Sequence, residues 1–111
     1  MNTIFDRIIA KEVPCKKVFE NDRIIAFHDI APAAPVHLLI VPKKPIQNLA
    51  DASDEDAAVL GECLLVARDL AKEFNLLDGY RVITNSGAHS GQLVHHIHFH
   101  LLGGRKLGPL G

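Results

Sequence analysis

Clustered charge and long apolar runs are both missing from this chain of 111 residues. Its 12 basic and 13 acidic side chains leave a net charge of −1. Proteins that bind nucleic acids or anionic membranes usually gather positive charge on one surface. No apolar run approaches the ~20 residues that a membrane-spanning helix requires. We therefore predict neither a nucleic-acid partner nor a membrane partner.

Paired cysteines are missing as well. Cys15 and Cys63 lie far apart and form no Cys-x-x-Cys motif. Two isolated thiols in a domain of this size are typical of a reduced protein rather than of a disulfide framework. Four charged side chains interrupt the first 14 residues, which therefore lack the apolar core of a secretory signal. We expect a cytoplasmic protein, and the length predicts one domain over residues 1–111.

The hydrophobic pattern predicts helices and strands in an order typical of the α+β class. Apolar residues at helical spacing predict a short helix over residues 4–10 and a long helix that Ser53 begins and Phe74 ends. Short β-prone runs predict strands over 17–20, 23–28, 37–41, 80–84 and 94–102. Because strands mostly follow strands, we expect an antiparallel sheet rather than a wound parallel one.

The most unusual stretch is residues 95–102, HHIHFHLL, which holds four of the seven histidines of the chain. Side chains alternate between the two faces of a strand, so His96, His98 and His100 are predicted to share one face. The apolar residues between them then share the other face and can pack against the long helix. His95 is expected to point with the apolar set or to lie where the strand begins.

Three interpretations of this histidine row are open. The rings can form a structural row on a half-exposed strand. They can hold a metal ion, since neutral imidazole is a common ligand and His37 is available as a further donor. They can also perform nucleophilic catalysis, in which one neutral ring attacks phosphorus and its neighbours orient it. The glycine-bearing loop SGAHSGQ, residues 86–92, can present backbone N–H groups to an anion.

Residues 96–102, HIHFHLL, resemble the His-φ-His-φ-His-φ-φ signature of the histidine triad (HIT) nucleotide-binding proteins, in which φ is an apolar residue. The resemblance extends over almost the whole chain, through TIFDRII, AFHDIAPAAPVHLLIVPKKPI, GYRVITNSG and GQLVHHIHFHLLGGR. The sequence Leu-Gly-Gly-Arg at 102–105 is similar to the Hint branch of the family, because the Fhit-like branch usually has a proline soon after the triad.

This resemblance implies a five-stranded antiparallel sheet with one long and one short helix. It implies a homodimer in which two such sheets continue into one ten-stranded surface. The implied activity is hydrolysis of purine nucleoside phosphoramidates, with an AMP or GMP moiety, through a nucleotidyl-histidine intermediate. The products are a nucleoside monophosphate and an amine, and neither a metal nor another cofactor is required.

The resemblance also implies roles for individual residues. His98 is the nucleophile, His96 orients it, His100 contacts the phosphate oxygens, and His37 completes the group. The phosphate is expected to lie beside Asn85 and the backbone near Gly91 and Gln92. The base and ribose are expected among a set that the resemblance places in the nucleotide pocket: Ile4, Phe5, Ile8, Phe27, His28, Asp29, Ile30 and Leu39. Asp29 would accept the ribose hydroxyls, although from the residues alone it reads as a turn residue.

One position departs from the family pattern. Many Hint proteins carry a serine two positions after the loop glycine, where it helps to protonate the leaving nitrogen, and this chain has Leu93 there. Leucine cannot donate a hydrogen bond, so another group or water must assist the leaving amine. An alternative interpretation is therefore a nucleotide-binding or regulatory module with weak or vestigial catalysis. His95 stands where tyrosine is frequent, and His89 is expected to be solvated in its loop.

Overall fold

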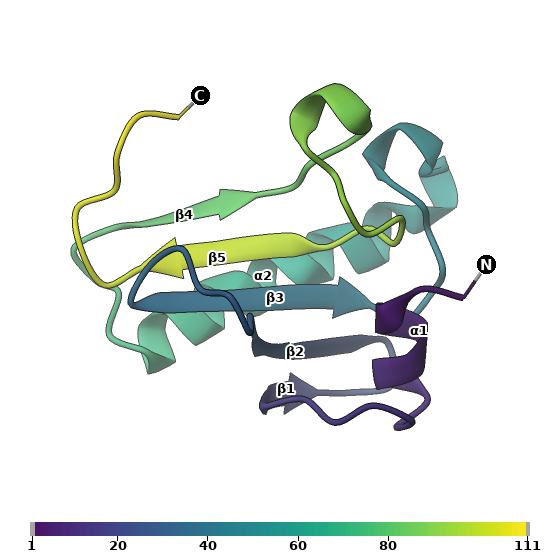
Figure 1. Ribbon diagram of the computed structural model, residues 1–111, viewed down its shortest axis with the longest axis horizontal. Coiled ribbons are helices and arrows are strands. Elements are labelled where there is room, and N and C mark those ends of the chain that lie inside the picture. Colours follow the sequence, from purple (N-terminus) through teal and green to yellow (C-terminus); the bar gives the residue numbers. More distant parts are fainter. Residues whose placement is uncertain (1, 111) are drawn as a thin grey trace.

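An antiparallel sheet of five strands forms the centre of the computed structural model, which describes residues 2–110 (Figure 1). The ends of the predicted domain and tail, Met1 and Gly111, lie outside the described residues. The strands are β1 (Lys17–Glu20), β2 (Ile24–His28), β3 (Val36–Pro42), β4 (Tyr80–Ile83) and β5 (Phe99–Gly103), in the spatial order β1-β2-β3-β5-β4. The helices are α1 (Ile4–Ile9) and α2 (Ala57–Glu73), and three 3₁₀ turns cover Leu49–Asp51, Asp54–Asp56 and Ala88–Ser90.

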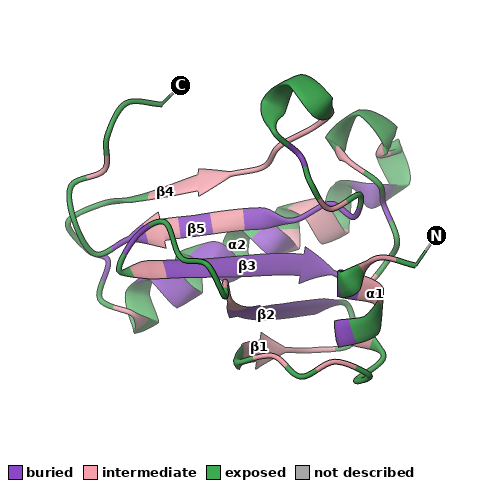
Figure 2. Cartoon of the chain, viewed as in Figure 1, coloured by how far each residue is buried: buried purple, intermediate pink, exposed green. Residues whose placement is uncertain are grey.

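The two faces of the sheet carry different hydrophobic clusters. The long helix α2 covers one face, where its Ala67 and Leu70 pack with strand residues such as Leu38 and Leu101 (Figure 1). Short helix α1 joins a second cluster that includes Phe27, one of the strand residues whose side chains point the other way. Because β2 and β3 are buried on both faces, they read as almost continuous apolar runs (Figure 2).

Both helices begin at capping boxes that the sequence contains. The hydroxyl of Thr3 accepts hydrogen bonds from the first turn of α1, while the carboxylate of Asp6 accepts the backbone N–H of Thr3 at 2.7 Å. Ser53 and Asp56 repeat this arrangement before α2, whose first turn is a 3₁₀ turn. The predicted start of the long helix at Ser53 is therefore confirmed, and so is its end near Phe74.

The predicted α+β class with a five-stranded antiparallel sheet is confirmed, but the last strand is shorter than predicted. It begins at Phe99 rather than at residue 94. Before Phe99 the backbone N–H of Ile97 donates to the carbonyl of Ile46, and the carbonyls of His96 and Pro42 accept hydrogen bonds from histidine rings. His95 is consequently not a strand residue and its side chain is exposed. Within residues 2–110, neither helix has the length and apolar character needed to cross a membrane.

Candidate active site

A cavity of about 1090 Å³ lies on the side of the sheet that carries α1 and the histidines. His37, His98 and His100 line it, whereas His96 does not. Every residue predicted to contact the nucleotide also lines it: Ile4, Phe5, Ile8, Phe27, His28, Asp29, Ile30, Leu39, Asn85, Gly91 and Gln92. Residues from five separate segments of the chain thus meet around one space large enough for a nucleotide.

Two of these residues stand apart from the others in their surroundings. The ring of His28 packs edge-on against Phe74 at 5.8 Å, on the face of the sheet that α2 covers. His28 thus belongs to the cavity lining while its ring packs toward the face that α2 covers. Ile30 is fully exposed at the cavity rim, where it has no packing partner to hold it in a pocket wall.

The wall also contains residues that the sequence did not single out. Residues 13–16, Val-Pro-Cys-Lys, join it from the segment between α1 and β1, and Pro32 and Pro35 join it from the loop after β2. The segment between α1 and β1 has no periodic pattern, so only the folded chain brings it to the cavity. The two prolines lie within the stretch DIAPAAP, whose rigidity was the one available signal.

His98 is held on both sides by backbone hydrogen bonds. Its Nδ1 lies 2.8 Å from the carbonyl oxygen of His96, and the hydroxyl of Thr84 donates to the carbonyl of His98 at 2.8 Å. The ring meets Phe5 of α1 edge-on, with 4.9 Å between the centroids. Burial lowers the pKa of His98 below its ordinary value of 6.5, so the ring is neutral at neutral pH.

His96 is 1% exposed and lies behind His98 rather than in the cavity wall. Its Nε2 donates to the carbonyl of Pro42 at 2.7 Å, and its Nδ1 is 3.7 Å from the carboxylate of Asp6. The same residue thus joins the end of β3, helix α1 and, through its own carbonyl, the ring of His98. Thr84, which sequence reasoning missed, completes this support from the segment that follows β4.

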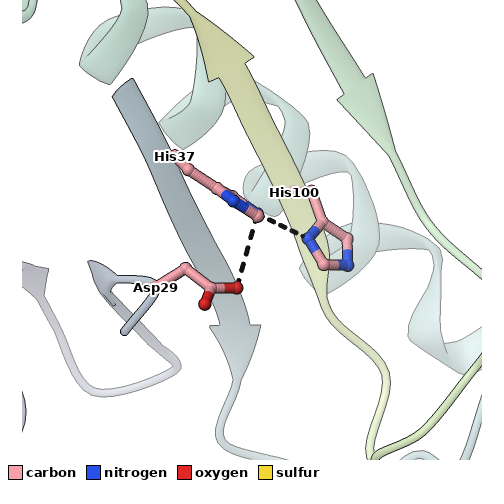
Figure 3. Close-up of side chains that lie close together, drawn as sticks. All are labelled: Asp29, His37 and His100. Carbon is pink, nitrogen blue, oxygen red and sulfur yellow. Dashed lines mark hydrogen bonds and ion pairs between the residues drawn. The ribbon is translucent and has the colours of Figure 1, made fainter. Parts of the chain in front are cut away.

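His37 and His100 face each other across neighbouring strands, with Asp29 beside them (Figure 3). The Nε2 atom of His37 lies 2.9 Å from Nδ1 of His100 and 3.4 Å from a carboxylate oxygen of Asp29. On its other side, Nδ1 of His37 accepts the backbone N–H of Ala33 at 3.0 Å. Burial lowers the pKa of His37 and, together with the neighbouring His98 and His37, lowers the pKa of His100 to about 4.

Asp29, His37 and His100 also bring three potential metal-binding atoms within 4.8 Å of one another. The hydrogen bonds around them do not suit a metal ion. Because Nδ1 of His37 accepts an N–H, the proton of the neutral ring is on Nε2, the atom that a metal would have to contact. A metal-bound histidine instead donates its other N–H to an acceptor. The arrangement favours a chain of hydrogen bonds between the rings.

The loop at 86–92 is held by the side chain of Gln92. Its amide oxygen accepts the N–H of Gly87 at 2.9 Å, and its amide nitrogen donates to the carbonyls of Gln47 and Val94. Gly91 has a φ of 89°, a conformation that glycine adopts readily. The Gln92 side chain is therefore committed to hydrogen bonds that hold this loop, and Gly91 and Gln92 both line the cavity.

Three further predicted positions lie around this loop. Leu93 is 89% exposed and is among the residues that line the cavity. His89 and His95 are both exposed and lie outside the cavity lining. The four histidines that come together are therefore His37, His96, His98 and His100.

Comparison with known proteins places this geometry in context. The chain matches the HIT domain family over residues 10–107. It is 49% identical over 106 residues to an uncharacterised HIT-like protein of Synechococcus elongatus, covering 96% of this chain and 93% of that protein. A HIT family hydrolase from Legionella pneumophila Philadelphia 1 is similar in structure with a TM-score of 0.94, 45% identity and 96% coverage of each chain. A histidine triad protein from Clostridium difficile reaches a TM-score of 0.95 at 41% identity, covering 100% of this chain and 97% of that one.

Proposed function

The chain belongs to the HIT domain family, and from that premise we propose that it hydrolyses purine nucleoside phosphoramidates through a nucleotidyl intermediate on His98. The observation that carries this proposal is the 2.8 Å hydrogen bond between Nδ1 of His98 and the carbonyl of His96. A carbonyl only accepts, so the ring proton is on Nδ1 and the lone pair is on Nε2. His98 is therefore a neutral, oriented nucleophile in the wall of a nucleotide-sized cavity.

The reaction has two steps. In the first, the Nε2 lone pair of His98 forms a bond to phosphorus, and the bond between phosphorus and the amine nitrogen breaks. The electron pair leaves with the amine, which takes a proton from water, because Leu93 at the rim has no donor. In the second step, a water oxygen bonds to phosphorus, the bond to Nε2 breaks and its electron pair returns to His98, while a proton of the water passes to solvent.

The rest of the cavity suits a nucleoside monophosphate. Phe5, Phe27 and Leu39 form a buried apolar wall on which a purine can stack. Asp29 accepts the N–H of Ala31 with one carboxylate oxygen at 2.8 Å and retains lone pairs for two ribose hydroxyls. The phosphoryl oxygens then lie between His100 and the backbone of the loop at 86–92.

We also propose that the protein forms a homodimer through an edge of its sheet. Both outer strands, β1 and β4, have a partner on one side only within the described chain. An unpaired strand edge exposes backbone N–H and C=O groups that a second copy can satisfy.

The test is to incubate the purified protein with adenosine 5′-phosphoramidate, with and without EDTA, beside His98→Ala and His89→Ala. We expect the wild type and His89→Ala to release AMP whether or not EDTA is present, and His98→Ala to release none while remaining folded. His89→Ala is the matched control, because His89 lies outside the cavity lining.

Other outcomes contradict the proposal. A folded, fully active His98→Ala would exclude His98 as the nucleophile, and loss of activity with EDTA would indicate a metal site. Tight AMP binding with negligible turnover would favour the alternative function, a nucleotide-binding module. The observation that favours this alternative is Leu93, an exposed residue at the rim whose side chain has no donor for a leaving amine.

A further inference from the structure

The loop between β2 and β3 is tied to the turn that follows β5 by two independent contacts. The guanidinium of Arg105 donates from Nη2 to the carbonyl of Ala33 at 3.0 Å. Next to it, Gly104 has a φ of 97°, and a Cβ at this position would lie 2.9 Å from Cβ of Pro35. The turn is therefore pressed closely against the loop, and Arg105 holds the backbone at Ala33.

Ala33 in turn determines where the protons lie on two rings. Its N–H donates to Nδ1 of His37, so a neutral His37 carries its proton on Nε2. That atom faces the carboxylate of Asp29, which only accepts, and Nδ1 of His100 at 2.9 Å. His37 therefore donates to Nδ1 of His100, and a neutral His100 must carry its own proton on Nε2. Each bond fixes the direction of the next one.

We propose that Arg105 is a positioning residue, which acts through Ala33 and His37 to keep the Nε2–H of His100 directed at a phosphoryl oxygen in the cavity. This inference rests on the proposed function, because it needs a phosphoryl group beside His100. Arg105 itself is exposed and absent from the cavity lining, so it has no contact of its own with the substrate. A donor that strengthens its bond as charge develops on the oxygen contributes to kcat more than to KM.

The chain supplies a matched control for Arg105. Arg81 also uses Nη2 to donate to a backbone carbonyl, that of Gly108 at 2.8 Å, and this contact has no link to Ala33. We would compare Arg105→Ala with Arg81→Ala in the full chain. The first readout is ¹⁵N NMR of the histidine rings without substrate, which reports the proton position on each nitrogen and whether the Nε2–H of His37 is hydrogen-bonded. The second is the separate measurement of kcat and KM for adenosine 5′-phosphoramidate.

We expect Arg105→Ala to lose the hydrogen-bonded Nε2–H signal of His37 and to lower kcat about tenfold with little change in KM, because a donor to the developing charge is misaligned rather than removed. Arg81→Ala should keep both the signal and kcat. A second pair tests the backbone group directly. Ala33→Pro removes the N–H and should reproduce the effect of Arg105→Ala, whereas Ala33→Gly keeps the N–H and should not.

Two results would overturn the inference. One is an unchanged His37 signal in Arg105→Ala, which would mean that Ala33 does not depend on Arg105. The other is a lost signal with unchanged kcat, which would mean that the chain of rings does not act on the reaction. If the wild type itself releases no AMP, the proposed function fails, and the substrate-free NMR comparison still decides whether Arg105 positions the rings.

Discussion

The imidazole rings of the cavity wall differ from histidine in water because burial disfavours their charged forms. The pKa values of His37, His98 and His100 are all lowered from 6.5, that of His100 to about 4. For His98 the neighbouring carbonyl of His96 acts in the opposite direction, but burial is the larger effect. A histidine ring must be neutral to act as a nucleophile. Burial, which removes water from the ring and lowers its pKa, therefore extends to lower pH the range in which His98 can attack.

The first prediction concerns this range. Because burial lowers the pKa of His98 from 6.5, the rate of phosphoramidate hydrolysis should decrease in acid with a midpoint below pH 6.5, as His98 takes up a proton. The measurement is a pH profile of kcat/KM together with an NMR titration of the His98 ring. A titration midpoint at or above 6.5 would contradict the buried, neutral nucleophile.

At the level of secondary structure, the sequence predicted what depends on local patterns. Helical spacing of apolar residues, the cap at Ser53 and short β-prone runs were enough to predict both helices and the five strands. Alternation predicted that His96, His98 and His100 share one face of a strand from residue 94, yet the strand begins only at Phe99, and His96 does not line the cavity that His98 and His100 line. Before it, the rings of His96 and His98 contact the carbonyls of Pro42 and His96, and the backbone N–H of Ile97 donates to the carbonyl of Ile46.

What remained beyond prediction depends on contacts between distant segments. Thr84 supports His98 across 14 residues, and Arg105 reaches Ala33 across 72 residues. Neither residue has a pattern in its neighbourhood that indicates a partner. The resemblance placed His28 in the nucleotide pocket, and the residue lines the cavity, but only the folded chain shows that its ring packs against Phe74.

The second prediction concerns the turn after β5. In Gly104→Ala the new Cβ meets Pro35 and the residue must keep a φ of 97°, so we expect the free energy of unfolding to fall by about 1–2 kcal/mol. Gly108→Ala lies in the same segment with nothing within 4 Å of the added atom, so urea denaturation should show little change for it. Equal effects of the two substitutions would mean that the close approach to Pro35 does not constrain the turn.

The whole molecule should respond to acid in the window set by its histidines. The unfolded chain takes up protons on these rings near pH 6.5, whereas folded His37, His98 and His100 bind them only at lower pH. The unfolded state thus binds more protons between pH 6.5 and about 4, the lowered pKa of His100. The stabilising contribution is fully present above pH 6.5 and is lost as the pH falls through this window.

The third prediction follows from that sign. We expect the free energy of unfolding, measured with urea, to decrease by about 1–3 kcal/mol from pH 7 to pH 4, because the unfolded chain binds protons on these rings that the folded chain does not. Partial exposure of the rings to solvent limits the size of this decrease. His100→Gln should flatten this dependence because it removes the ring with the lowest pKa, and His89→Gln should leave it unchanged. A stability that is independent of pH between 6.5 and 4 would contradict the burial of these rings as neutral groups.

The fourth prediction concerns assembly, because the two edges of the sheet differ in charge. At the β1 edge, Glu20 pairs with Lys17 and Lys43, and lysines at a strand edge discourage pairing with another sheet. The β4 edge has Arg81 as its one charged residue and presents the half-exposed ring of Tyr80. We therefore expect the sheets of two copies to join at the β4 edge rather than at the β1 edge.

We expect the wild type to sediment as a dimer at micromolar concentration and Tyr80→Lys to weaken the dimer about tenfold, since a two-fold interface contains each substitution twice. Leu110→Lys, in the C-terminal tail and 84% exposed, is the matched control and should sediment like the wild type. A monomeric wild type would exclude the dimer, while a wild-type dimer that Tyr80→Lys leaves intact would move the interface away from β4.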